Sequence, residues 1–282
     1  MIAATQATLY CGAVLYLAAT VFAVVFLRTL SKPALRVASR LTWCAGMLYL
    51  LAFLLRWATW RLLPLTTMGD SLVLFVLLST VIALWVTRNR ETQPLLAFFL
   101  PLVAVVCLAQ AGVVHTYSDV GPRALRGAFL TAHVGSAFLA YALFFVASIT
   151  SAAYLFQVYQ LKRHQTSGLF QRLPSLEQLD QLLVRLTQFG FPAFLLTVVL
   201  GGVWAHVDRY LLAPRWWLSP KVLGVWFTLA VYATALLGRS FGWLRGRRLA
   251  YVVAVGSAII LAAYVVLAAL QLRNLNFWGP AT

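Results

Sequence analysis

The chain has 282 residues, of which 62% are hydrophobic and 10% are charged, and its formal net charge is +16. Soluble domains carry roughly 25% charged residues, so this composition leaves too little polar surface to cover a water-soluble globule of this size. We therefore expect an integral membrane protein. The basic residues are spread over several short loops, a pattern typical of membrane topology and anionic lipid headgroups, so we expect membrane lipid and no nucleic acid as a partner.

Charge-poor stretches predict an all-α, polytopic membrane protein with about eight transmembrane helices, because about 20 apolar residues in a helix cross a bilayer. The stretches cover residues 5–27, 41–60, 71–87, 93–113, 127–160, 187–206, 219–238 and 249–271. No repeat or low-complexity segment divides the chain, so we expect residues 1–282 to form a single membrane domain. The first stretch has no basic residue before its apolar core, and we interpret it as a first span and not as a removable signal peptide.

The distribution of basic residues predicts the orientation of the chain. The loops 28–40, 88–92, 161–186 and 239–248 together hold 14 of the 22 lysines and arginines. Basic residues accumulate in cytoplasmic loops, so we expect these four loops inside and both termini outside. The expected location is a cytoplasmic (inner) membrane of the bacterial type.

The segment before the sixth span departs from the spanning pattern. Ser175 is suited to cap a helix, with Gln178 three residues later and Glu177 in the first turn. Leucines at helical spacing then define one apolar face. We therefore expect a short amphipathic helix near 174–186 that lies in the cytoplasmic interface before the chain turns into the sixth span. Its role could be that of an interfacial linker or of a docking site for a cytoplasmic partner.

The fifth span carries one imidazole near its outer end. Residues 127–161 include no Asp, Glu, Lys or Arg, and His133 is the metal-competent side chain of that stretch. Ionisable groups inside a membrane are costly and often functional, which makes His133 a candidate metal ligand, although a hydrogen-bonded packing residue is the alternative. Its small neighbours Gly135 and Ser136 would let another helix or a planar ligand approach closely.

Aromatic and basic residues gather just beyond the sixth span. The candidates in this outer loop and its flanks are Trp204, His206, Arg209, Arg215, Trp216, Trp217 and Lys221. Tryptophans and cations anchor helices at any bilayer interface. They would also suit haem, with aromatic faces for the macrocycle, cations for the two propionates and an imidazole for the iron. Arg56 and Arg126 should lie at the same depth and are further candidates for this cationic rim.

The chain has few other residues that suggest a chemical function. Cys11, Cys44 and Cys107 lie in separate predicted spans, and no C-x-x-C or C-x-x-C-H occurs, so the chain is neither a thiol oxidoreductase nor itself a c-type cytochrome with covalently bound haem. Any bound haem would be non-covalent. No nucleophile, metal cluster or phosphate loop suggests catalysis, and we do not expect an enzyme.

Four segments in a characteristic order suggest a family. They are residues 132–135 with Tyr141, residues 179–205, residues 216–223 and residues 242–248. Together with the tryptophan-rich outer loop they resemble the cytochrome c assembly family of membrane proteins, of the CcsA/CcmC type, and especially its HemX/YpjD-like branch. The resemblance covers about residues 125–275, while residues 1–125 match in layout, including Arg56 near the end of the second span.

Departures from the family pattern narrow what the resemblance implies. Members that translocate haem carry an Asp where this chain has Ser219 and a histidine where it has Leu237, and they have an outward histidine after the last span. No histidine follows His206 here, so His133 remains from the family's haem ligands. The resemblance implies haem or a related tetrapyrrole at an outer, Trp-rich site, a role in cytochrome c biogenesis, and other cytochrome c assembly or haem-synthesis proteins as partners.

Two other functions remain open. One is a membrane scaffold that regulates an enzyme of haem synthesis, as the HemX-like branch suggests, through residues 174–186 and the basic loop 239–248. The other is a small-solute transporter, which is disfavoured because charged residues are nearly absent from the helix centres where a substrate pathway would need them.

Overall fold

The structure is a computed structural model and describes residues 2–60, 64, 68–113, 128–164, 168–207, 216–218 and 220–272. These residues form eight long helices and three short 3-10 helices, and no strand occurs among them. The long helices are α1 (Ile2–Thr29), α2 (Lys32–Trp60), α3 (Met68–Val86), α4 (Leu96–Val113), α5 (Ala128–Lys162), α6 (Leu176–Val207), α7 (Pro220–Ser240) and α8 (Arg247–Leu272). The 3-10 helices are η1 (Gln93–Leu95), η3 (Gly168–Arg172) and η5 (Trp216–Leu218).

The helices confirm the predicted multi-pass membrane architecture. Over their described residues, α1 to α7 are each long and apolar enough to cross a membrane. Helix α8 covers the eighth charge-poor stretch, residues 249–271. Each predicted span therefore corresponds to a helix. A long run without charge can enter the bilayer, and a helix satisfies the backbone hydrogen bonds there because no water is available to do so.

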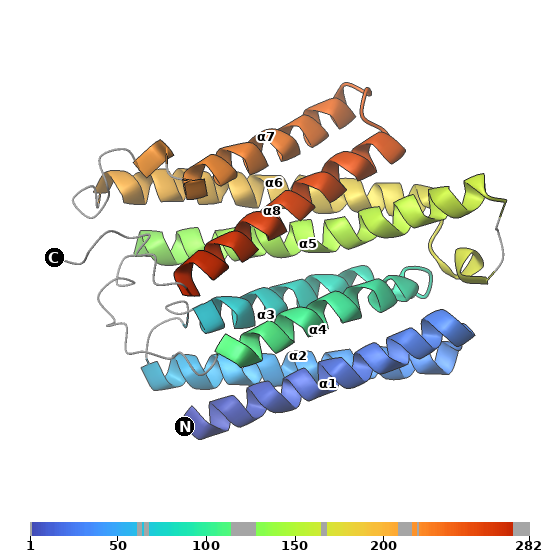
Figure 1. Ribbon diagram of the computed structural model, residues 1–282, viewed down its shortest axis with the longest axis horizontal. Helices are drawn as coiled ribbons and strands as arrows, with labels where there is room; N and C mark the ends of the chain where they lie inside the picture. Colours follow the sequence, from blue (N-terminus) through green and yellow to red (C-terminus); the bar gives the residue numbers. More distant parts are fainter. Residues whose placement is uncertain are drawn as a thin grey trace.

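The helices pack as two groups of four (Figure 1). In the first group α1 packs on α2 and α4, and α3 packs on α2 and α4; in the second group α5 packs on α6 and α8, and α7 packs on α6 and α8. The two groups meet mainly where α3 contacts α5. Helices α1, α3, α5 and α7 begin at one end of the bundle, called here the His133 end, and α2, α4, α6 and α8 begin at the opposite end, called the Asp180 end (Figure 1).

The first group contains buried polar side chains that pair with one another. The hydroxyl of Tyr16 lies 2.6 Å from that of Thr80, and the Tyr49 hydroxyl donates to Gln110 Oε1 at 3.2 Å. The Tyr16 and Tyr49 rings meet edge to face with centroids 5.5 Å apart. All four side chains are almost completely buried. These contacts join α1 to α3 and α2 to α4 in the interior of the bundle.

Helix α6 begins at the predicted cap but does not include a separate interfacial helix. The Ser175 N–H donates to Gln178 Oε1 (3.0 Å) and the Gln178 N–H donates to Ser175 Oγ (3.2 Å), which is a capping box. From there α6 continues without interruption to Val207. Its leucines Leu179, Leu183 and Leu186 are fully buried, so this face packs against neighbouring helices and not against the lipid interface. The expectation of a short helix near 174–186 that turns before the sixth span is therefore wrong.

Candidate functional site

The imidazole of His133 lies between α5 and α6. Its Nδ1 atom is 2.7 Å from the backbone oxygen of Thr197. A carbonyl oxygen can only accept, so Nδ1 carries the proton in this hydrogen bond and Nε2 carries the ring's lone pair. Metal-binding histidines are commonly oriented in this way, with one ring N–H held by a carbonyl and the other nitrogen presented to the metal.

Two hydroxyl groups hold α5 and α6 together at the level of this imidazole. Thr197 Oγ1 donates to Ser136 Oγ at 2.9 Å, and Ser136 Oγ donates to the His133 backbone oxygen at 3.0 Å. Ser136 was expected at this level as a small residue that permits close approach, and the structure adds its hydrogen bond across the helix pair. The position of the His133 ring is therefore fixed from both helices.

Gly201 makes room for the His133 ring. A Cβ atom at position 201 would lie 2.7 Å from Cε1 and 2.9 Å from Nδ1 of His133, closer than side-chain atoms approach in proteins. The neighbouring Gly202 has open space, with nothing within 4 Å of a Cβ at that position. The glycine pair of the sequence motif thus has one member that the imidazole requires and one that it does not.

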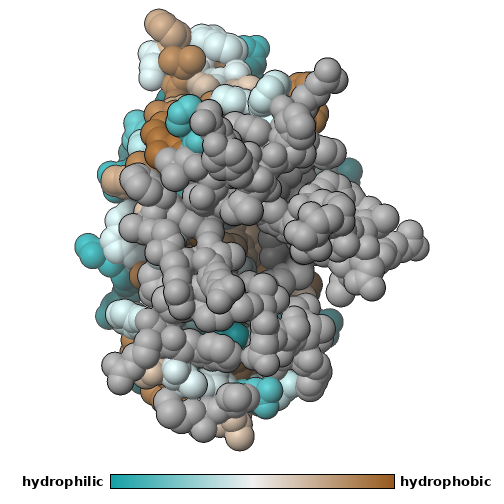
Figure 2. Space-filling view, turned by 90° about the vertical axis from the view of Figure 1, so that its left-hand side faces the viewer, coloured by the Kyte–Doolittle hydropathy of each residue, from teal (hydrophilic) through white to brown (hydrophobic). Residues whose placement is uncertain are grey.

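Most of the other predicted site residues belong to the same end of the bundle. His206 is exposed in the last turn of α6, and Trp217 is 49% exposed in η5. Trp204, Trp216 and Lys221 lie in α6, η5 and α7, and their side chains are outside the described part of the chain. Arg126, Arg209 and Arg215 also lie outside the described residues. Figure 2 looks onto this end of the bundle. Both hydrophilic and hydrophobic described residues are seen around the edge of this face. Whether these groups form one site with His133 stays a prediction.

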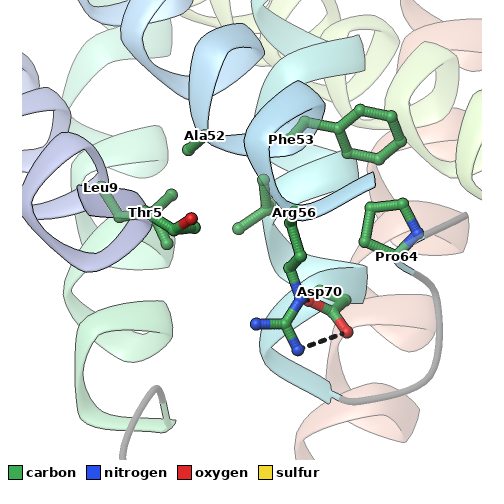
Figure 3. A pocket seen from close by; sticks show the side chains of 8 residues that line it. Thr5, Leu9, Ala52, Phe53, Arg56, Pro64 and Asp70 are labelled. Carbon is green, nitrogen blue, oxygen red and sulfur yellow. Dashed lines mark hydrogen bonds and ion pairs between the residues drawn. The ribbon is translucent and has the colours of Figure 1, made fainter. Parts of the chain in front are cut away.

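Arg56 lies at the expected end but is bound to a carboxylate. Its Nη2 donates to Asp70 Oδ2 at 3.1 Å, and its Nε forms an ion pair with Oδ1 of the same residue (Figure 3). The Asp70 side chain is 1% exposed and that of Arg56 is 15% exposed. This pair ties the end of α2 to the first turn of α3, where a carboxylate also complements the helix dipole. The geometry favours a structural role for Arg56 over one in the cationic rim.

The sequence reading missed this ion pair and the Thr197 carbonyl that holds His133. Asp70 could have indicated this pair, because an acidic residue at the beginning of a span is rare in this sequence. Among the residues described, no group of three or more His, Cys, Asp or Glu side chains is arranged to hold a metal ion. A metal at the described part of this end would therefore not be held by a cluster of three such side chains.

Comparisons with known proteins extend the resemblance over nearly the whole bundle. The family described as "Cytochrome C assembly protein" matches residues 7–272. The chain is 26% identical to protein HemX of Bacillus subtilis (strain 168) over 213 residues, which is 73% of each chain. It is 34% identical to protein HemX of Brevibacillus brevis over 146 residues, which is 51% of this chain and 53% of that protein.

A third relative carries a different name. The chain is 29% identical to the cytochrome c biogenesis protein CcsA of Synechococcus sp. (strain RCC307) over 259 residues, which is 82% of this chain and 81% of that protein. No solved structure matches. The family match begins in α1 and ends in α8, so it includes the first four helices as well as the region around His133. The chain therefore belongs to the cytochrome c assembly protein family.

Proposed function

We propose that this protein binds haem or a related tetrapyrrole non-covalently at the His133 end and serves cytochrome c biogenesis. The observation that carries the proposal is the hydrogen bond from His133 Nδ1 to the Thr197 oxygen, which directs the ring's lone pair to Nε2. The relative named as a cytochrome c biogenesis protein supports the biological setting. Family membership and seven helices that could span a membrane support a role within a membrane.

The residues proposed for this end are of the kinds that bind a tetrapyrrole. A bound haem would supply an iron that accepts a protein nitrogen, and a neutral imidazole held at Nδ1 would be suited to donate it. We assign the macrocycle to Trp204, Trp216 and Trp217 and the propionates to Arg126, Arg215 and Lys221. Arg56 is left out of this assignment because Asp70 binds its guanidinium. His206, exposed in the last turn of α6, is the candidate for a weak second ligand.

The proposed orientation puts the His133 end outside the cytoplasm. The four loops that contain 14 of the 22 basic residues all lie at the Asp180 end, which the positive-inside rule assigns to the cytoplasm. Both chain termini would then be extracytoplasmic, in a cytoplasmic membrane of the bacterial type. Reporter fusions after Thr282 and within residues 162–173 would test this, since the first should report outside and the second inside.

The cationic rim provides the test of the proposed site. Haem retained by the protein purified in detergent would be measured from the Soret band in wild type, Arg215→Ala, Lys221→Ala and Arg245→Ala. Each propionate contact could contribute about 1.5–3 kcal/mol, so the first two variants should retain roughly ten- to a hundredfold less haem. Arg245 lies at the Asp180 end and should behave as wild type. Equal retention in all four proteins, or a loss confined to Arg245→Ala, would place the site elsewhere.

A scaffold that regulates an enzyme of haem synthesis is the second candidate. It is favoured by the similarity to two proteins named HemX and by the fact that the chain retains His133 and no other family haem ligand. A folded, monodisperse preparation that takes up no haem while it co-purifies with a haem-synthesis enzyme would favour this function over the first.

A further inference from the structure

The loop between α7 and α8 has a fixed shape because Asp180 holds it from α6. Asp180 Oδ1 accepts the Gly246 N–H at 3.2 Å, and Oδ2 forms an ion pair with Arg239 Nη2 at 2.8 Å. Gly242 and Gly246 adopt positive φ angles of 81° and 54°, which glycine tolerates best. The loop is therefore held in one turn conformation at the Asp180 end of the bundle (Figure 1).

This turn and the beginning of α8 form an open pocket of about 610 Å³. Its lining residues are Gly242, Trp243, Arg245, Arg247, Arg248 and Tyr251. The three arginines are exposed, and among the described residues the ion pairs are Arg56–Asp70 and Arg239–Asp180, so no described carboxylate neutralises them. The pocket thus gathers three positive charges without a described acidic partner.

Two of the arginines contact a neighbouring residue of the pocket, one an aromatic ring and the other a glycine. The Arg247 guanidinium lies over the Tyr251 ring, 5.2 Å from its centroid, and Nη2 donates to the Tyr251 hydroxyl at 3.3 Å. The Arg245 guanidinium lies against Gly242, where a Cβ would come within 2.9 Å of Nη2. Planar guanidinium groups donate to phosphate oxygens in pairs, so this charge pattern is complementary to a phosphate group.

An apolar stripe leads from this pocket along α8 towards the middle of the membrane. Tyr251, Val255 and Ile259 follow one another at intervals of four residues and are therefore on one face of the helix. They are 47%, 55% and 37% exposed. Trp243, 54% exposed, lies in the loop beside them, as is usual for tryptophan at a bilayer interface. A ligand with both a phosphate and a hydrocarbon chain matches this surface better than a water-soluble anion does.

We propose that the α7–α8 loop and the first turns of α8 bind an anionic phospholipid. The arginines Arg245, Arg247 and Arg248 contact the phosphodiester headgroup, and one acyl chain lies along Tyr251, Val255 and Ile259. This site is separate from the tetrapyrrole site, because it lies at the opposite end of the bundle. It does not depend on the function proposed for His133.

The full-length protein in detergent, titrated with phosphatidylglycerol or phosphatidylcholine and observed by native mass spectrometry, tests this site. Arg247→Gln/Arg248→Gln should weaken phosphatidylglycerol binding about tenfold to thirtyfold, since each basic residue contributes on the order of one power of ten or somewhat less in affinity. Arg88→Gln/Arg90→Gln removes the same charge from exposed positions at the same end and is the matched control, expected to bind as wild type.

Three results would overturn the proposal. Equal weakening in the two double variants would mean that total charge, and not this pocket, attracts the lipid. Equal binding of phosphatidylcholine and phosphatidylglycerol by wild type would remove the role of the anionic headgroup. Displacement of the bound lipid by millimolar inorganic phosphate or by a soluble polyglutamate peptide would show that the pocket takes a water-soluble anion and that the acyl chain contributes nothing.

Discussion

Two polar sites, one in each half of the bundle, hold their side chains in different ways. In α1–α4, Tyr16 pairs with Thr80 and Tyr49 pairs with Gln110, and all four side chains are almost completely buried. In α5–α8, His133 is partly exposed near a helix end and bonds to a backbone oxygen. Side chains that bond to one another in the buried interior serve packing, whereas a partly exposed imidazole oriented by a carbonyl is suited to a ligand. A polar residue within a span therefore indicates a site only together with its exposure and partners.

The ion pairs differ between the halves as well, and breaking the buried pair should give the largest effect on stability. Asp70→Asn leaves the Arg56 guanidinium without its buried carboxylate, and losing one partner of a buried pair costs about 3–5 kcal/mol. Arg239→Gln breaks the more exposed pair, whose side chains are 31% and 18% exposed, and should cost less than about 1 kcal/mol. Equilibrium unfolding in detergent would measure both. Similar losses in the two variants would contradict the contrast between a buried and a more exposed pair.

The next largest effect should come from the glycine beside His133. Gly201→Ala places a methyl group within 2.7 Å of the imidazole, and overpacking of this kind costs about 1–3 kcal/mol. The displaced ring should also lose its bond to Thr197 and with it the proposed haem affinity. Gly202→Ala, which enters open space, is the matched control and should preserve both stability and haem binding. If the two alanine variants bound haem equally, the contact between Gly201 and the ring would have no bearing on function.

The smallest effect should come from the buried interior of α1–α4. Tyr49→Phe removes the hydrogen bond to Gln110, and such bonds between membrane helices average about 0.6 kcal/mol. Because this bond lies in the half without His133, haem binding should stay at the wild-type level. Unfolding and haem titration of the same preparation would check both parts. A loss of haem in Tyr49→Phe at wild-type stability would show that the first half takes part in the site.

The helices could be predicted from the sequence because charge-poor length alone defines a membrane span. The Ser175–Gln178 cap was equally predictable, since it depends on residues three apart. The packing of residues 174–186 could not be predicted, because a leucine face at helical spacing fits a lipid interface as well as a neighbouring helix. The contact of Gly201 with His133 depends on how α5 and α6 are aligned, and the Arg56–Asp70 pair depends on how α2 and α3 meet. Neither alignment is encoded in a local pattern.

The role of His133 as the iron ligand can be tested most directly by the absorption spectrum of the purified protein with haem. His133→Ala should abolish or strongly shift the Soret band while the amount of protein inserted in the membrane stays unchanged, because one imidazole adds little to the partitioning of a span. His206→Ala should keep the band, with at most a small change from the loss of a weak second ligand. An unchanged Soret band in well-expressed His133→Ala protein would contradict the ligand role of this histidine.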